Sequence, residues 1–375
     1  MSMETTLILR ASPRFELRRL DELTSEQRAP FVELERNDGF YGLLVPRPPF
    51  EANVKSIAAD GAALFRSLAS PGSIAVDDEV IDLVLDGVLE VAHGDDFHWG
   101  AGALRHVGLA LPPLAQVNAV ERLSLEALRY AADLETGDSS LLATALYLYN
   151  RIPISRFWRS RFADRQAILG QLGADRGALA SLLETHWMSG TSQGWITWRP
   201  RAPRPRDMNA AMFKLYVSAR PESIRDAFEA VVRVLAERGG ADFKIGDSAY
   251  GLLRPDKLVM YFGSRREVDD VAGALAKRLA GCAAHGVPFT AGIDEDGLLS
   301  WGVDPPESER ALSWMGRESW RLWLATKLGN ALALAKLSAP GGDRETVCGF
   351  ALERVRRFGV DVERWTPTES LWSAQ

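Results

Sequence analysis

The sequence predicts an α+β protein built from two parts, and three observations indicate this fold class. Residues 1–198 carry apolar residues at helical spacing over long stretches, with one β-like stretch among them. Residues 199–207 are rich in proline and arginine, which interrupts both helices and strands. Residues 208–375 alternate short β-like runs with helical patterns, as α+β sheet layers do. We therefore expect a mainly helical N-terminal domain with a β-hairpin, a linker and an α+β domain.

The first part is expected to be mainly helical and to contain one hairpin. The hairpin is predicted about Asp86 and Gly87, a turn-forming pair that separates the apolar runs 80–85 and 88–91. This part shows no residue spacing typical of a catalytic site, so we expect it to dock a peptide or a partner protein. Helices are predicted within residues 51–69, 120–148 and 160–187.

The second part is expected to alternate strands with helices. Pro221 begins one predicted helix, and Gly239 with Gly240 ends it, in agreement with residue preferences at helix ends. Residues 247–256 are predicted to form a turn or a short helix. Strands are predicted at 213–218, 243–246, 258–262, 287–292 and 297–303, and helices at 221–237, 266–279, 310–337 and 344–358.

The composition is that of an ordinary globular protein. With 375 residues, 46% of them hydrophobic and 25% charged, the chain is long enough to bury one large core or two. The net charge of −6 argues against nucleic-acid or anionic-membrane binding by the whole surface. Residues 1–19 contain no long apolar run, so we expect no signal peptide and no membrane span. Two isolated cysteines fit a reducing cytoplasm, which is the expected location.

Three histidines lie close together in the sequence, at His93, His98 and His106. A metal site is one interpretation of such a cluster. The segment carries no cysteine and several glycines make it loop-like, so surface or capping histidines are the favoured interpretation. We expect no metal and no other cofactor.

Lysine is rare in this chain and is concentrated in one segment. Lys and Arg total 44, of which only seven are lysine, yet Lys214, Lys244 and Lys257 fall within or beside three predicted strands. Arginine stays charged, whereas a desolvated lysine is able to lose its proton and act as a base. The alternative interpretation is that these lysines sit at strand edges, where their charge discourages pairing between sheets.

The neighbours of these lysines carry a resemblance to a known family. The pattern consists of Phe213 to Ala219, a helix, Phe243-Lys244, and a strand from Lys257 to Phe262. It resembles the phosphothreonine lyase fold of bacterial type III effectors and of the lyase domains in class III and IV lanthipeptide synthetases. It is most similar to the stand-alone HopA-type effector relatives that act as lyases in class V lanthipeptide and thioamitide pathways. The resemblance covers about residues 210–303 and implies a phosphothreonine lyase-like second domain.

The resemblance implies roles for residues on these strands. Lys244 falls on the family's base and Lys214 on its phosphate-orienting lysine, whereas Tyr216 stands where the family has an acidic histidine. The stretch 287–303 lacks the family's phosphate-holding arginines, which is a departure from the pattern. The resemblance therefore implies Lys244, Tyr216 and Lys214 as catalytic residues, and Tyr261 matches a tyrosine of the family. We nominate Arg254, Arg317 and Arg321 as substitutes for the missing arginines and Lys257 as a further cation, so the expected phosphate-binding residues are Lys214, Arg254, Lys257, Tyr261, Arg317 and Arg321.

The implied reaction is β-elimination of phosphate from phosphoserine or phosphothreonine in a precursor peptide. The sequence contains no phosphate-binding Gly-Lys loop and no His-Arg-Asp loop, so the resemblance implies a separate kinase as a partner. The alternative is a non-catalytic phosphopeptide-binding or effector protein on the same fold. Taken singly, the site residues also have structural interpretations: Lys214 as an edge charge, the tyrosines as core, and Arg317 with Arg321 as an exposed helix face. Trp314, Trp320 and Trp323 are expected in a core or a domain interface.

Overall fold

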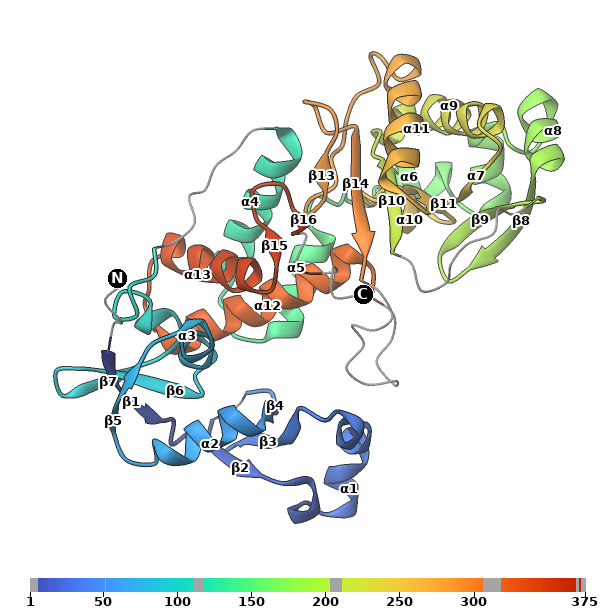
Figure 1. The fold of residues 1–375 in the computed structure, drawn as a ribbon. Coiled ribbons are helices and arrows are strands. Elements are labelled where there is room, and N and C mark those ends of the chain that lie inside the picture. The colour runs from blue at the N-terminus through green and yellow to red at the C-terminus, as the bar shows by residue number, and fades with distance from the viewer. Residues whose placement is uncertain are drawn as a thin grey trace.

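A seven-stranded antiparallel sheet is the centre of the second part. The computed structural model describes residues 6–50, 52–110, 118–202, 211–305, 318–368 and 371. Every pair of neighbouring strands in this sheet is antiparallel. The strand order is β13 (Ala291–Gly292), β14 (Leu299–Asp304), β10 (Met212–Val217), β12 (Leu258–Phe262), β11 (Asp242–Gly246), β9 (Trp195–Pro200) and β8 (Trp187–Ser192) (Figure 1).

One face of this sheet forms an apolar core under helices. Side chains alternate between the two faces along a strand, and Leu215, Phe243 and Met260 point to the covered face, where all three are buried. The strongly amphipathic helix α9 (Ile224–Glu237) packs its apolar stripe into the same cluster. The other helices around this core are α6 (Arg156–Arg161), α7 (Arg165–Leu172), α8 (Gly177–His186), α10 (Ala249–Leu252) and α11 (Arg265–Arg278).

A second core lies among four helices that come from both ends of the chain. These are α4 (Ala119–Asp133), α5 (Ser139–Leu148), α12 (Trp320–Ser338) and α13 (Arg344–Arg357). A Cβ atom on Gly329 would lie 2.7 Å from backbone atoms of Ser139 and Ala143, so this glycine lets α12 and α5 approach closely. Trp320 is fully buried here and stacks on Trp323, as expected for core residues.

Residues 6–98 form two small sheets beside the helical layer of α4, α5, α12 and α13 (Figure 1). Several of these strands were not predicted from the sequence, although the α+β class itself is confirmed. The remaining short elements are α1 (Ser25–Arg28), β15 (Val360–Asp361) and β16 (Thr366–Pro367). The two sheets and their helices comprise β5 (Gly72–Ala75), β1 (Thr6–Ala11), β6 (Leu89–His93) and β7 (Asp96–His98), then β2 (Phe15–Arg18), β3 (Phe40–Pro46) and β4 (Lys55–Ala58), with α2 (Ala59–Ser67) and α3 (Asp78–Leu85).

The predicted hairpin about Asp86 and Gly87 is wrong, because the run before it is helix α3. The Asp77 carboxylate accepts a hydrogen bond from the Val80 N–H at 2.8 Å and so caps the start of this helix. The buried residues of this helix are Val80, Val84 and Leu85, and such a set, with two adjacent members, follows one side of a helix. A short apolar run fits both patterns, and the acidic residues before it were the signal for a helix.

The expected linker overlaps the sheet. Strand β9 includes Arg199 and Pro200 and pairs with β11, so the sheet continues across the boundary expected at residue 198. Arg201 also bonds back, since its N–H donates to the His186 carbonyl at 2.9 Å. Residues 203–207 of the linker lie outside the described residues.

Most of the predicted strands and helices of residues 211–305 are confirmed, but the strand predicted at 287–292 is only Ala291–Gly292 in the structure. Strand β12 coincides with its prediction, and β10, β11, α9 and α11 differ from theirs by one to three residues at their ends. The helix predicted at 310–337 is seen as α12 from Trp320, and residues 310–317 lie outside the described residues. Among the described helices, none combines the length and the apolar character needed to cross a membrane.

Candidate active site

Four of the nominated side chains share one face of the central sheet, which we call the lysine face. Lys214 on β10 lies opposite Tyr261 on β12, and both Tyr216 on β10 and Lys244 on β11 lie opposite Val259. Residues opposite each other in a sheet point to the same side, and so do residues two apart along a strand. The lysine face is therefore defined by Lys214, Tyr216, Lys244 and Tyr261, on the side away from the helix-covered core.

Lys244 is partly buried between two aromatic rings. Its Nζ lies 4.1 Å from the ring centroid of Trp195 on β9 and 5.6 Å from that of Tyr261. Burial lowers the pKa of Lys244 to about 8, and the Lys214 cation adds to this effect, while the Asp256 and Asp304 carboxylates oppose it. At this pKa about a tenth of the amine is uncharged at pH 7, which makes it available as a base.

Lys214 forms an ion pair with Asp304, whose carboxylate also accepts a hydrogen bond from the first turn of a helix. Its Nζ lies 2.5 Å from Asp304 Oδ2, with the lysine 8% and the aspartate 21% exposed. The other oxygen, Asp304 Oδ1, accepts a hydrogen bond from the Trp320 N–H at 2.9 Å at the start of α12. The Lys214 Nζ is also 5.4 Å from the Tyr261 ring centroid. Lys214 is thus fixed in place, and part of its charge is balanced.

Arg254 reaches the same region from the loop before β12. Its guanidinium donates to both carboxylate oxygens of Asp256, at 2.9 and 2.8 Å, and to the Tyr147 hydroxyl at 2.8 Å. It also lies 5.4 Å from the Trp195 ring centroid, next to Lys244. Burial alone would raise the pKa of Asp256, but the guanidinium groups of Arg321 and Arg254 lower it to about 2. Asp256 is therefore ionised and orients Arg254.

Arg321 contacts Asp256 from the protein interior and is not accessible to a ligand. It is 1% exposed, and its Nη1 lies 2.8 Å from Asp256 Oδ2. Its Nε donates to the Pro288 carbonyl at 3.0 Å, and its Nη2 donates to the Tyr147 carbonyl at 3.1 Å. The structure places Arg321 as a partner of Asp256, in contrast to the phosphate ligand that the sequence analysis expected. Arg317, its predicted companion, lies outside the described residues.

Lys257 is sealed in the interior, away from the group around Lys244. It is fully buried, and its Nζ donates to the Ala219 carbonyl at 2.9 Å and to His285 Nδ1 at 2.8 Å. Burial lowers the pKa of Lys257 to about 7 and that of His285 to about 3. The neutral imidazole then donates from Nε2 to the Asn150 carbonyl at 2.5 Å. Lys257 therefore anchors the loop that carries His285. Its role expected from the sequence was to bind phosphate.

Tyr216 is the nominated acid, and its surroundings disfavour that role. It is 3% exposed and packs against Val259 and Val287. Burial raises the pKa of Tyr216 well above its ordinary value, with the Asp304 carboxylate adding to the effect. Burial likewise raises the pKa of Tyr261, which is only half-buried and faces both Lys214 and Lys244. Of the two phenols, Tyr261 is the one with access to a bound molecule.

The charges around Lys244 favour an anion. Four described cations, Lys214, Lys244, Arg254 and Arg321, lie among three carboxylates. These are Asp256, Asp304 and Asp242, which lies opposite Tyr261 on the same sheet face. This local excess of positive charge contrasts with the net charge of −6 for the chain. A doubly charged anion such as a phosphate monoester would be attracted here.

Sequence reasoning missed the residues that shape this site. Trp195 lies before the stretch that carries the resemblance, and Asp304 lies just after it. Asp256 stands in the loop Arg254-Pro255-Asp256-Lys257, where an acidic residue between cations was the available signal. Nothing in the sequence pattern indicated that Tyr147 or His285 would reach the sheet.

The three clustered histidines show no metal-binding arrangement. The His93, His98 and His106 rings pack on one another, with centroids 4.3 to 6.2 Å apart. Across the described residues, no group of three or more His, Cys, Asp and Glu side chains is arranged to hold a metal ion.

The fold and this site together define an α+β protein with two lysines on one open face of an antiparallel sheet. No family model and no curated protein matches the chain. Among solved structures, an effector protein from Pseudomonas syringae pv. tomato strain DC3000 is similar, with 12% identity and a TM-score of 0.40 over 67% of this chain and 98% of that one. An effector from Pseudomonas syringae pv. syringae strain 61 shows 13% identity and a TM-score of 0.36 over 68% and 99%.

A third similar structure is the phosphothreonine lyase SpvC, an effector protein from Salmonella. Its identity to this chain is 13% and its TM-score 0.28, over 42% of this chain and 92% of that one. These identities and TM-scores are too low to establish a family or an activity. The functional argument therefore rests on the geometry of the lysine face.

Proposed function

We propose that the protein is a phosphoserine or phosphothreonine lyase, which eliminates phosphate from a phosphorylated precursor peptide and leaves a dehydroamino acid. The observation that carries this proposal is Lys244, an amine with a pKa lowered to about 8 between two aromatic rings. Such an amine acts as a base near neutral pH. Lys214 and Arg254 beside it supply fixed positive charge for the phosphate oxygens.

In the proposed step, Lys244 acts as the base, and Lys214 and Arg254 supply positive charge. The Lys244 amine takes the proton from Cα of the phosphorylated residue. The electron pair of that bond becomes the second bond between Cα and Cβ, and the bond from Cβ to the ester oxygen breaks. Phosphate leaves with the electrons of that bond, and Lys214 and Arg254 stabilise the charge that develops on its oxygens.

The leaving phosphate also needs a proton, and we assign its donor to Tyr261 in preference to Tyr216. Tyr261 is partly exposed and lies near both lysines, whereas Tyr216 is almost fully buried. A phosphate monoester has a second pKa of about 6, so the singly protonated ester reduces the demand on this donor.

The proposed setting is ribosomal peptide natural-product biosynthesis of the lanthipeptide or thioamitide kind. The support for it is the sequence resemblance around Lys214 and Lys244. A separate peptide kinase would phosphorylate the precursor, and the reaction would take place in the cytoplasm. The first part of the chain would then serve to hold the precursor or the kinase.

A second candidate function is phosphopeptide binding without catalysis, as in an effector on the same fold. One observation favours it: both proposed phosphate ligands already have carboxylate partners, Lys214 with Asp304 and Arg254 with Asp256. A phosphate would have to share these cations, which suits weak binding as well as it suits turnover.

The test is incubation of the purified protein with a phosphoserine and a phosphothreonine peptide, followed by mass spectrometry. A decrease in peptide mass equal to phosphoric acid supports the lyase. A decrease equal to HPO3, which hydrolysis of the ester produces, indicates a phosphatase and contradicts the proposal. Binding of the phosphopeptide without mass change supports the second candidate. Lys277→Ala is the matched control, because Lys277 is exposed on α11 away from the lysine face.

A further inference from the structure

The distribution of lysine points to a second place of interest. Six of the seven lysines fall into two groups. One group is Lys214, Lys244 and Lys257 of the central sheet, and the other is Lys55, Lys327 and Lys336, which all line one cleft. The chain otherwise prefers arginine, so three lysines on one cleft, two from α12 and one from the start of β4, are unusual for this sequence.

The cleft has a volume of about 950 Å³ and lies between the N-terminal sheets and the helical layer. This is at the upper end of the roughly 300–1,000 Å³ typical of ligand sites. One wall is the C-terminal half of α12 with the end of α13, and the opposite wall is the segment leading into β4. None of the residues around Lys244 lines it, so the cleft is separate from the lysine face.

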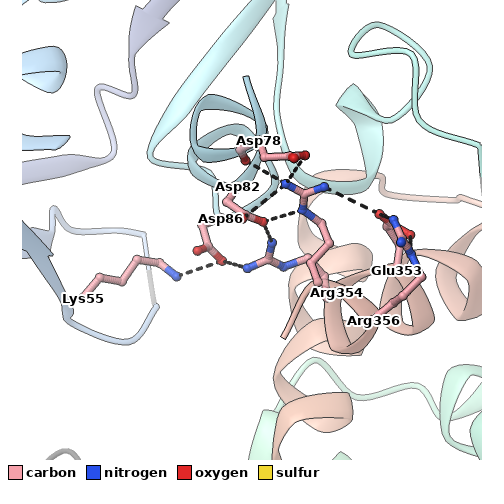
Figure 2. A network of polar contacts seen from close by, with 8 residues as sticks. Lys55, Asp78, Asp82, Asp86, Glu353, Arg354 and Arg356 are labelled. Atoms are coloured by element: carbon pink, nitrogen blue, oxygen red, sulfur yellow. Dashed lines mark hydrogen bonds and ion pairs between the residues drawn. The ribbon is translucent and has the colours of Figure 1, made fainter. Parts of the chain in front are cut away.

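The opposite walls are joined by an ion-pair network at one end of the cleft. Figure 2 shows Arg354 of α13 directed at Asp82 and Asp86 of the α3 segment, with Lys55 reaching Asp86 from the other side. The Arg354 guanidinium lies 2.8 Å from each of these carboxylates, and Lys55 Nζ lies 3.5 Å from Asp86. Arg354 is only 4% exposed, which makes this end of the cleft well fixed.

The charge along the described lining is positive. Four cations, Lys55, Lys327, Lys336 and Arg354, line the cleft together with two carboxylates, Asp86 and Asp138. Arg354 also pairs with Asp82 outside the lining, and the Lys336 amine donates a hydrogen bond to the Leu134 carbonyl. Both carboxylates have internal roles, since Asp86 pairs with Arg354 and Asp138 accepts the N–H groups that begin α5. In a chain with a net charge of −6, this lining favours an acidic ligand.

The cleft also offers exposed apolar side chains beside those lysines. Leu337 of α12 is 45% exposed and Phe358, just after α13, is 38% exposed. Lys327 Nζ lies 4.7 Å from the Phe358 ring centroid, so a cation and an apolar surface are presented together. A ligand that carries both carboxylates and apolar side chains matches this combination.

We propose that this cleft binds an acidic peptide segment bearing apolar side chains. The proposal is independent of the lyase chemistry, because it concerns a separate cleft and needs no phosphate on the ligand. Carboxylates of the peptide pair with Lys327 and Lys336, and its apolar side chains cover Leu337 and Phe358.

The test uses a fluorescein-labelled synthetic peptide of glutamate and leucine residues, titrated with the full-length protein and followed by fluorescence anisotropy. We expect saturable binding that is lost when lysine replaces glutamate in the peptide. Lys327→Glu should weaken binding about fivefold, because it exchanges an attraction for a repulsion at a partly exposed site. Lys277→Glu makes the same change on α11 and should leave binding unaltered.

A second pair of variants tests the apolar part. Leu337→Ser should weaken binding, while Leu322→Ser, at an exposed leucine of the same helix outside the cleft, should not. Leu337 is exposed, so this variant reports on the cleft even where Lys327→Glu fails to fold. Absence of saturable binding, equal binding of the lysine-containing peptide, or full displacement of the labelled peptide by pyrophosphate would each overturn the proposal; the last would identify a site for small anions.

Discussion

Lys244 and Lys257 belong to neighbouring strand segments of one sheet, and burial lowers the pKa of both, yet their surroundings differ. Lys244 faces two aromatic rings on a partly open sheet face, with further cations beside it. Lys257 is fully enclosed and has two hydrogen-bond acceptors, the Ala219 carbonyl and His285. The pKa of Lys257 is the lower of the two.

This difference shows that a lowered pKa does not by itself mark a catalytic lysine. A base must also reach the substrate, and only Lys244 has that access. Lys257 satisfies its amine within the protein, as structural buried groups do. Sequence reasoning nominated both lysines for the phosphate site, and the contacts of their amines separate them.

The largest expected effect is the loss of elimination in Lys244→Ala. We expect the rate of phosphate elimination to fall about 10³-fold, because a general base typically contributes 10²- to 10⁴-fold. The measurement is the rate of dehydroamino acid formation by mass spectrometry, with circular dichroism to verify the fold. A correctly folded variant that retains most of the activity would exclude Lys244 as the base and remove the contrast with Lys257.

Arg321→Met is expected to reduce stability strongly. It leaves the buried Asp256 with one cation instead of two, and breaking a buried ion pair typically costs about 3–5 kcal/mol in the free energy of unfolding. Urea unfolding measures this loss. The control is Arg233→Met, which breaks an exposed pair with Glu229 and should change stability by less than about 1 kcal/mol. Unchanged stability with weakened phosphopeptide binding would instead return Arg321 to the role that the sequence analysis expected.

The stability of the wild-type protein should rise with pH because of Lys257. Its folded pKa of about 7 lies below the unfolded value of about 10.4, so between these values the folded state binds fewer protons than the unfolded state. The free energy of unfolding should therefore increase by up to about 1.4 kcal/mol per pH unit from pH 7 upward, and this contribution is lost as the pH falls through 7.

Lys257→Met should flatten that rise. Urea unfolding of both proteins at several pH values between about 7 and 10 provides the comparison. Equal slopes for the two proteins would show that Lys257 keeps its proton in the folded state, which would contradict the lowering of its pKa by burial.

The pH dependence of the reaction sharpens the role of Lys244. Its uncharged form is the base, so kcat/KM should rise about tenfold between pH 6 and 7 and level off above about 8. The measurement is initial rate across this range with a phosphothreonine peptide. A rate that declines with increasing pH over the same range would mean that a protonated group limits the reaction.

Tyr216→Phe is expected to have the smallest effect. Because Tyr216 is almost fully buried and out of reach of a bound peptide, removing its hydroxyl should change the elimination rate by less than about threefold. Tyr261→Phe is the matched variant, and it should slow the reaction by a larger factor. If the order of the two effects is reversed, the proton donor is the tyrosine at the family's histidine position.

The strands that carry the lysines were predictable because their signals are local. Strand β12 is a continuous run of five apolar residues between turn residues, β10 is apolar except for Lys214, and β11 alternates polar with apolar residues. Lys214 and Tyr216 share a face because they are two apart on one strand, whereas the register that brings Lys244 to that face is a property of the assembled sheet. The contributions of Trp195, Tyr147 and Asp304 to the site were not predictable, because their positions depend on which segments pack together over long sequence separations.

The first part of the chain was less predictable for a different reason. The run 80–85 is apolar at nearly every position, and such a run fits a buried strand and a helix equally well. The helix is favoured over a strand by the Asp77 cap and by the packing of Val80 and Val84 into the core of the N-terminal sheet. Strands β1, β2 and β4 are short and only partly buried, so they leave a weak pattern in the sequence.

The position of β9 has a consequence for how the gene can be divided. A fragment that starts at residue 208 would contain the whole stretch that resembles the lyases, but it would lack β8 and β9. The backbone of β11 would then become an open edge that recruits other chains into aggregates, and Lys244 would lose the indole that shelters it. The recognisable stretch is therefore not a self-sufficient module, and any excised or transplanted version must begin before residue 187.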